Sequence, residues 1–198
     1  QVYRFSTRKF LPNKKNRYFK DSKPVIPFEL KQINKNSINK MKEIHIVGGL
    51  HPDWKFEKYL EIVREVSKAA PDAHIKAFTA VEIDWFSQIS GKSVSKVISD
   101  LMNAGVDALP GGGAEIFSPE VRKKICTPKT TGDSWLEIHR EAHKQGLPSN
   151  ATILYGHLES YDDVIDHVSR LRDLQDDTNG FFAFIPVLFQ PFNTRLSK

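Results

Sequence analysis

The stretch Leu109-Pro110-Gly111-Gly112-Gly113-Ala114-Glu115-Ile116-Phe117 places three consecutive glycines and one carboxylate directly after a short apolar run. Glycine lacks a Cβ atom, so its backbone can approach a ligand closely or adopt a positive φ angle. The stretch therefore predicts a strand that ends in a small-molecule site, with Glu115 as its acidic group. The alternative interpretation is a tight turn between a strand and a helix, in which Glu115 is a solvated acid at the helix start.

The same strand-then-site pattern recurs on both sides of this stretch. Strands are expected at residues 44–47, 74–78, 106–109, 150–155 and 181–189, and helices at 56–70, 94–104, 134–144 and 161–176, from apolar periodicity and Gly or Pro stops. Ser134, with Glu137 three residues later, is expected to be the N-cap of the third helix. Alternating strands and helices predict an α/β fold with parallel strands and right-handed crossovers, as a barrel or a doubly wound sheet.

Ligands in either architecture bind at the carboxyl ends of the strands, which is where the glycine and polar residues fall in this chain. None of the glycine runs matches a phosphate loop or a dinucleotide fingerprint. We therefore expect a shared small-molecule site at the strand ends. Its candidate residues are Gly48, Gly49, His51, Thr79, Glu82, Gly111, Gly112, Gly113, Glu115, Asn150, Tyr155, Gly156 and His157.

Composition narrows the class of protein. The single cysteine, Cys126, excludes an internal disulfide framework and cannot by itself hold a cysteine-based metal cluster. No apolar run approaches membrane-spanning length and no secretory signal is visible, so a cytoplasmic protein is expected. Residues 1–42 carry 12 Lys or Arg against 2 Asp or Glu, whereas the remainder carries 17 against 22. The basic segment contains no recognisable nucleic-acid motif, so nucleic-acid binding is not favoured.

Four segments together resemble the aminofutalosine synthase family of radical S-adenosylmethionine enzymes. They are HIVGGLHP at residues 45–52, KAFTAVEI at 76–83, LPGGGAEIF at 109–117 and NATILYGHLE at 150–159. The resemblance extends from about residue 42 to about residue 189. Dehypoxanthine futalosine cyclases and deazaflavin-forming synthases share part of these motifs but tend to have Phe-Ser-Pro at the third strand. The sequence Phe78-Thr79-Ala80-Val81-Glu82 in this chain favours aminofutalosine synthase.

The resemblance implies a partial (βα) barrel of the radical S-adenosylmethionine type, incomplete at both ends, and a place in menaquinone biosynthesis. A 4Fe–4S cluster held by a CxxxCxxC motif would reduce S-adenosylmethionine. An electron donor such as flavodoxin or ferredoxin would supply the electron to the cluster. The 5′-deoxyadenosyl radical would add to the enolpyruvyl double bond of 3-[(1-carboxyvinyl)oxy]benzoate. Rearrangement and loss of the carboxylate would then give aminofutalosine.

The resemblance also implies residue roles. The backbone of Gly48 and Gly49 would meet the methionine amino group, and Tyr155-Gly156-His157 would line the adenosyl pocket. Substrate contact or proton handling would fall to the acidic and imidazole groups, with His51 shaping a turn as the alternative. Those groups are Glu82, Glu115, His51 and His157. Four other histidines are expected to be structural residues on helix or strand surfaces: His74, His139, His143 and His167. Cys126 is expected to have no role in the site.

The chain departs from the family in one respect, because no CxxxCxxC motif is present. Residues 1–42 are interpreted as the basic segment that follows the motif, and residues 43–198 as the partial barrel core. The cysteines would lie upstream of Gln1, or this is a degenerate copy without a cluster. The segment alone is expected to be inactive and prone to aggregate. The other hypotheses are a cyclase or deazaflavin-type relative and a cluster-less binding protein.

Overall fold

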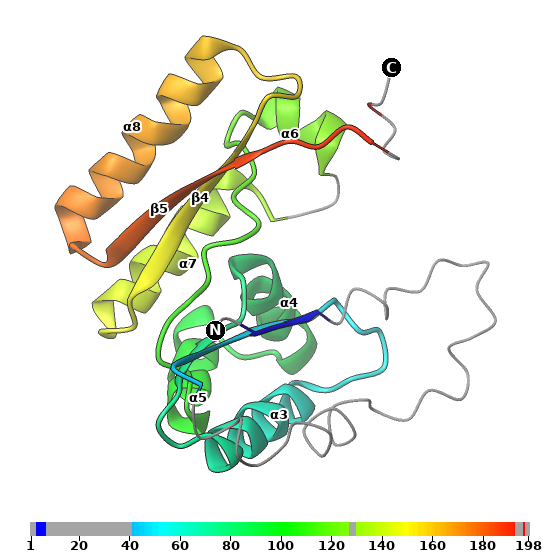
Figure 1. The fold of residues 1–198 in the computed structure, drawn as a ribbon, viewed down its shortest axis with the longest axis vertical. Coiled ribbons are helices and arrows are strands. Elements are labelled where there is room, and N and C mark those ends of the chain that lie inside the picture. Colours follow the sequence, from blue (N-terminus) through cyan, green and yellow to red (C-terminus); the bar gives the residue numbers. More distant parts are fainter. Residues whose placement is uncertain (1–2, 7–40, 127–129, 193–195, 197–198) are drawn as a thin grey trace. The chain divides into compact units, whose positions relative to one another are not determined.

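The computed structural model describes residues 3–6, 41–126, 130–192 and 196 (Figure 1). The chain forms two compact units, which we describe separately. The first comprises residues 1–78 and 85–108, and the second comprises residues 79–84 and 109–198. Helix α4 (Ala80–Ser90) contributes residues to both units.

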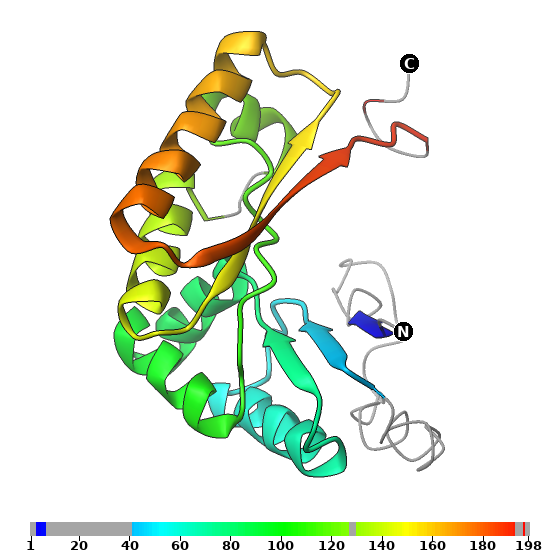
Figure 2. The same cartoon turned by 60° about the vertical axis from the view of Figure 1, so that its left-hand side comes forward.

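The first unit contains a parallel three-stranded sheet in the order β1 (Tyr3–Ser6), β2 (Glu43–Val47), β3 (His74–Ala77). Ala108 extends this sheet by a parallel bridge to Lys76. Helices α3 (Phe56–Ala69) and α5 (Val94–Ala104) lie on one side of β2 and β3 (Figure 2). Strand–helix–strand connections that keep their helices on one side, as in a barrel of parallel strands, leave the opposite face of the strands without a helix.

Local sequence explains these elements. Strand β2 alternates, with Ile44 and Ile46 buried at 3% and 4% exposure between less buried neighbours. Helix α3 buries an apolar stripe at helical spacing. Helix α5 begins at Ser93, whose side chain accepts a hydrogen bond from the Lys96 amide, and ends at Gly105 in the left-handed conformation.

The second unit contains β4 (Ser149–Tyr155) paired in parallel with β5 (Phe181–Leu188), and Leu109 adds a parallel bridge to Ser149. Helices α7 (Gly132–Lys144) and α8 (Tyr161–Thr178) lie on one side of these two strands (Figure 2). Short helix α6 (Pro119–Ile125) follows the triple-glycine stretch. Both units thus show the parallel, helix-covered strands predicted for an α/β barrel type of fold.

Several predictions of local structure were wrong. Helix α7 begins at an N-cap Thr131 rather than at Ser134, because the Thr131 hydroxyl accepts a hydrogen bond of 3.1 Å from the Ser134 amide. The predicted strand at 106–109 is reduced to single bridges at Ala108 and Leu109. Strand β1 and helices α4 and α6 were not predicted. Apart from β1, the basic segment at 1–42 lies outside the described residues until Met41.

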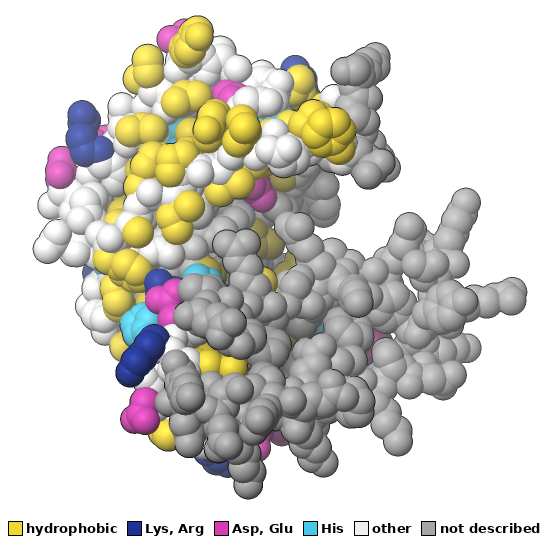
Figure 3. Space-filling model, in the orientation of Figure 1, with side chains coloured by type: hydrophobic (Ala, Val, Ile, Leu, Met, Phe, Trp, Pro, Cys, Tyr) yellow, Lys and Arg dark blue, Asp and Glu magenta, His cyan; other side chains and the backbone are white. Residues whose placement is uncertain are grey.

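An apolar surface covers β5 and part of α8 in the second unit. Figure 3 shows hydrophobic side chains gathered along β5. Ile165 and Val168 on α8 are 62% and 42% exposed. The exposed apolar residues of β5 are Phe182, Phe184, Ile185, Val187 and Leu188. Among the described residues, no helix combines the length and hydropathy that crossing a membrane requires.

Candidate functional site

The turn after β2 is held by a tyrosine of α3. The Tyr59 hydroxyl donates to the Gly49 carbonyl at 3.3 Å and accepts from the His51 amide at 3.2 Å. Tyr59 is 2% exposed and packs among Trp54, Phe78 and Phe86. The double-glycine turn is therefore fixed by a buried side chain from the helix expected at residues 56–70.

His51 has local partners at the same turn. Its ring stacks on Trp54 with centroids 4.7 Å apart, and its Nδ1 accepts a hydrogen bond of 3.1 Å from the Asp53 amide. Partial burial lowers the pKa of His51, and the charge of Asp53 opposes that shift. These contacts are those of a neutral imidazole that shapes the turn, and its Nε2 is the nitrogen that could meet a ligand.

The triple-glycine stretch is packed closely against neighbouring backbone in the second unit. Gly111 has φ +77°, and a Cβ atom there would come within 2.1 Å of the Asn150 carbonyl oxygen. Gly113 has φ +85°, and its Cβ atom would meet the Val81 side chain at 2.6 Å. A Cβ atom at Gly112 would come within 3.2 Å of the Thr79 methyl group. The structure thus brings Thr79, the three glycines and Asn150 together, and two of the glycines are required for close packing and positive φ.

A buried arginine that the sequence analysis missed clamps this stretch. Arg122 of α6 is 7% exposed, and its guanidinium donates to the carbonyls of Ala114, Ile116 at 3.0 Å, Gly113 at 3.4 Å and Thr130. Five N–H donors in a fixed fork suit such a set of acceptors. The loop shape is therefore set by one cation, which is hidden in the sequence inside the run Arg122-Lys123-Lys124.

Glu82 and Thr79 form a reciprocal contact at the start of α4. The Glu82 carboxylate accepts hydrogen bonds from the Thr79 amide at 2.8 Å and the Thr79 hydroxyl at 2.7 Å. The Glu82 amide donates to the Thr79 hydroxyl at 3.4 Å. This is capping-box geometry. Glu82 is 4% exposed, so its capping contact orients Thr79 beside Gly112.

Glu115 and Asn150 both belong to the second unit: Glu115 lies on the loop after the triple glycine, and Asn150 lies on β4. Glu115 has a positive φ of 47° and is half-buried, and its carbonyl accepts a hydrogen bond of 2.7 Å from the Leu154 amide. Asn150 is 3% exposed, and its Oδ1 atom has no hydrogen-bond partner among the described residues. A buried amide oxygen without a partner is costly, so Asn150 is a group to which a bound donor would add stability.

The turn after β4 is organised by Glu159. Its carboxylate accepts hydrogen bonds from the Gly156 amide and, at 2.9 Å, from the His157 amide. Burial of Glu159 raises its pKa, but these amide hydrogen bonds outweigh burial and the pKa is lowered. Tyr155 is 39% exposed and Gly156 has φ +85°.

His157 is enclosed at this turn. Its Nε2–H donates to the Leu154 carbonyl at 2.9 Å. Its Nδ1 accepts from the Leu158 amide at 2.7 Å or, when protonated, donates to Glu159 at 3.0 Å. The side chain is 0% exposed. In this arrangement both ring nitrogens are used by the protein, so His157 positions the turn.

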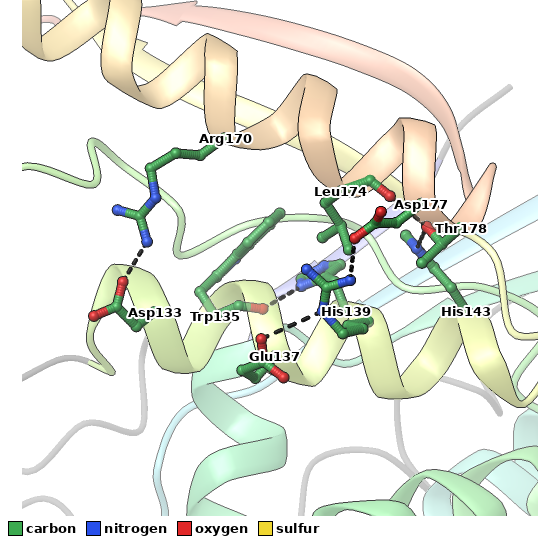
Figure 4. Close-up of polar contacts among 10 residues, drawn as sticks. Asp133, Trp135, Glu137, His139, His143, Arg170, Leu174, Asp177 and Thr178 are labelled. Atoms are coloured by element: carbon green, nitrogen blue, oxygen red, sulfur yellow. Dashed lines mark hydrogen bonds and ion pairs between the residues drawn. The ribbon is translucent and has the colours of Figure 1, made fainter.

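Three histidines expected on element surfaces are buried instead. His139 and His167 are 0% exposed and His143 is 9% exposed. Figure 4 shows His139 beside Trp135 and His143 beside Thr178 between α7 and α8. His143 also contacts the Ser149 hydroxyl at 2.8 Å. The expectation of a structural role agrees with these contacts, but the surface placement was wrong because residues 135, 139 and 143 share one helix face.

The residues of this chain do not fit a 4Fe–4S cluster. Such clusters are held mainly by cysteine thiolates, and Cys126 is the only cysteine of the 198 residues. Cys126 is buried where α6 ends. Within the described ranges no group of three His, Cys, Asp or Glu side chains is placed to hold a metal ion. The cluster ligands would have to come from outside these residues.

Comparison with known proteins shows the family of this chain. The family model of the radical SAM superfamily matches residues 7–171. The chain therefore belongs to the radical SAM superfamily, whose enzymes use S-adenosylmethionine and a 4Fe–4S cluster.

Among curated relatives, the chain is 48% identical over 158 residues to the aminodeoxyfutalosine synthase of Thermus thermophilus, covering 80% of this chain and 42% of the relative. It is 48% identical over 150 residues to the same enzyme of Streptomyces coelicolor, covering 76% and 39%. It is 44% identical over 156 residues to the 5-amino-6-(D-ribitylamino)uracil–L-tyrosine 4-hydroxyphenyl transferase of Methanopyrus kandleri, covering 79% and 42%. The chain thus spans about two-fifths of the length of these relatives.

Proposed function

We propose that this chain is the core of an aminofutalosine synthase in menaquinone biosynthesis. The enzyme would join the 5′-deoxyadenosyl group of S-adenosylmethionine to the enolpyruvyl double bond of 3-[(1-carboxyvinyl)oxy]benzoate. The observation that carries the proposal is the 48% identity to two curated synthases over 158 and 150 residues. The packed group of Thr79, Gly111–Gly113 and Asn150 gives those ends a defined shape.

The chain's own residues would bind and orient the two substrates. In the first unit, Tyr59 holds the Gly48–Gly49 turn, so that the backbone there is preorganised for the methionine amino group. In the second unit, Thr79 and Asn150 would bind polar groups of the ligands beside the triple-glycine turn. Tyr155 and Gly156 would line the adenosyl pocket, with His157 fixing their turn. Glu115 and His51 are the groups we propose for substrate contact.

The cluster would be supplied by cysteines outside the 198 residues and reduced by a flavodoxin- or ferredoxin-type donor in the cytoplasm. When bound, it would provide the electron that cleaves S-adenosylmethionine. A chain that has no such cysteines would be a cluster-less binding protein.

A second candidate reaction is supported by the Methanopyrus kandleri relative at 44% identity. The name of that relative describes the transfer of a 4-hydroxyphenyl group from tyrosine to 5-amino-6-(D-ribitylamino)uracil. A deazaflavin-type reaction of this kind would use the same strand ends with a different acceptor. The two candidates differ in substrate and product, and these can be measured.

The test is a paired product assay on the intact natural protein, reconstituted anaerobically with iron and sulfide. One reaction contains S-adenosylmethionine and 3-[(1-carboxyvinyl)oxy]benzoate, and the other contains S-adenosylmethionine, tyrosine and the ribitylaminouracil. We expect aminofutalosine in the first reaction and no coupled product in the second, as measured by mass spectrometry. A coupled product in the second reaction alone would overturn the proposal.

A further inference from the structure

Glu115 has a backbone conformation that glutamate rarely adopts. Its φ angle is +47°, and among the described residues Asn179 is the only other non-glycine residue with a positive φ. Asn179 is the left-handed C-cap of α8, a position that asparagine sometimes occupies. Glu115 does not end a helix, since it lies between the triple glycine and α6, which begins at Pro119. The left-handed conformation of Glu115 therefore requires a cause in its surroundings.

Hydrogen bonds fix both peptide groups that meet at the Cα atom of Glu115. The Ala114 carbonyl, on the amino-terminal side, accepts from the Nη1 group of Arg122. The Glu115 carbonyl, on the carboxyl-terminal side, accepts from the Leu154 amide at 2.7 Å. The same Nη1 group also donates to the Ile116 carbonyl at 3.0 Å. Because a peptide group is planar, fixing these two groups fixes the φ and ψ angles of Glu115.

Arg122 is itself held by contacts outside this loop. Its side chain is buried, and its Nη2 group donates to the Thr130 carbonyl. The Thr130 hydroxyl donates in turn to the Asp84 carboxylate of α4 at 2.6 Å. A lysine, whose ammonium group is compact, cannot reproduce the planar fork that reaches these acceptors. The orientation of Arg122 is thus set independently of the residues that it holds around Glu115.

The residue type at position 115 indicates why this conformation is kept. Glycine adopts a positive φ without steric cost, and Gly111 and Gly113 of the same loop have φ angles of +77° and +85°. A glutamate in such a conformation adds strain, and the functional group that it adds is a carboxylate. Strained residues that are held by their surroundings are found mainly at functional sites. The half-buried Glu115 side chain is the group proposed above for substrate contact.

We propose that Arg122 is a positioning residue, which holds Glu115 in its left-handed conformation so that the Glu115 carboxylate meets the ligand in one orientation. This inference rests on the proposed function, in which Glu115 contacts substrate. The four described acceptors of Arg122 are all backbone carbonyls, so its side chain serves the loop and not the ligand. The effect of Arg122 on binding therefore passes through Glu115.

The test is a double-mutant cycle of Arg122→Lys and Glu115→Gln in the intact natural protein, reconstituted anaerobically with iron and sulfide. Calorimetry gives the dissociation constants of S-adenosylmethionine and of 3-[(1-carboxyvinyl)oxy]benzoate separately, without a reductant, so that no turnover occurs. Glu115→Gln should weaken binding of one ligand at least about tenfold, and Arg122→Lys should weaken binding of the same ligand at least about fivefold. The double variant should bind about as weakly as Glu115→Gln alone, because residues that act through one contact are not additive.

The matched control is Arg140→Lys, which removes a guanidinium group with two acidic partners from α7 and should leave both dissociation constants unchanged. Circular dichroism shows whether each variant is folded under the binding conditions. A second measurement does not require Arg122→Lys to fold. Glu115→Gly should have a higher urea midpoint than Glu115→Ala, because both variants lose the side chain but only glycine relieves the positive φ.

Additive losses in the cycle would overturn the positioning role, as would unchanged affinities in Glu115→Gln or in folded Arg122→Lys. Equal urea midpoints of Glu115→Gly and Glu115→Ala would overturn it as well. These outcomes are separate from those of the product assay. Aminofutalosine formation together with an additive cycle would remove the positioning role alone. A non-additive cycle for either ligand without aminofutalosine formation would remove the proposed function alone.

Discussion

Acidification is expected to destabilise the second unit through its buried histidines. Burial lowers the pKa of His139 from 6.5 to about 3, although a hydrogen bond to the Trp135 carbonyl opposes it. Burial likewise lowers the pKa of His143 and of His167 to about 4. Each group is neutral in the fold and binds a proton more readily when unfolded. Stability is therefore full above pH 6.5 and is lost as the pH falls from 6.5 toward 4.

The magnitude follows from proton linkage. Between pH 7.5 and pH 5, a histidine whose pKa is 6.5 unfolded and 3 to 4 folded loses about 2 kcal/mol of folding free energy. The three histidines together lose about 6 kcal/mol. Domains of ordinary stability have about 5–15 kcal/mol. The unit should therefore unfold at mildly acidic pH.

Two ion pairs, Arg140–Asp177 and Arg170–Asp133, connect α7 and α8 across the interface that contains these histidines (Figure 4).

The deciding variant is His139→Phe, which keeps a flat ring against Trp135 at the observed stacking distance of 3.6 Å and removes one titrating group. The Nε2 atom of His139 has no partner among the described residues, so the loss at pH 7.5 should be small. Between pH 7.5 and pH 5 the variant should lose about 2 kcal/mol less folding free energy than the parent loses.

Urea unfolding followed by far-ultraviolet circular dichroism at pH 7.5, 6 and 5 measures this difference, and this signal does not depend on Trp135. The matched control is Trp135→Phe, which alters the same stack without removing a histidine and should keep the parent's pH dependence. Equal losses of stability in His139→Phe and in the parent between pH 7.5 and pH 5 would refute the reasoning.

Three further predictions concern the loop and the surface. Arg122→Met should destabilise the chain by about 3 kcal/mol in urea unfolding, because four carbonyls lose a charged donor; a loss below about 1 kcal/mol would mean that the clamp is not needed. Gly111→Ala should cost more than Gly146→Ala in the same assay. Both have positive φ, but only Gly111 would also clash with backbone, so equal losses would contradict the packing role. Phe184→Lys should reduce self-association of the 198-residue chain in sedimentation velocity, since Phe184 is 46% exposed on β5; an unchanged distribution would exclude this surface.

Much of the fold could be predicted because its signals are local. A short β-branched run closed by Gly48 and Gly49 marked β2, and helical spacing marked α3, α5 and α8. The pattern Thr79-x-x-Glu82 was present as a capping-box signature and would have indicated α4. Strand β1 was not recognised because it is only four residues long and lies inside a basic segment, although Tyr3-Arg4-Phe5-Ser6 alternates aromatic and polar residues.

The site was harder to predict because its organisation depends on contacts between distant segments. The glycines of the Gly111–Gly113 turn were identified as a run that follows an apolar segment. The closeness of Gly111 to Asn150, however, depends on how the loop packs against β4. Arg122 sits among lysines in the sequence and resembles a solvated charge run. The ion pair between Glu43 and Lys76 joins two strands, and only the register of β2 and β3 shows that their side chains share a face.

Enzymes of the radical SAM superfamily need a 4Fe–4S cluster, and the single cysteine of these 198 residues cannot hold one. The most direct test is the intact mass and amino-terminal sequence of the natural protein. We predict a protein longer than the 198 residues that carries three cysteines in a CxxxCxxC motif ahead of the described barrel core. A natural protein in which Cys126 is the only cysteine would contradict the account, and the strand-end site would then serve binding without radical chemistry.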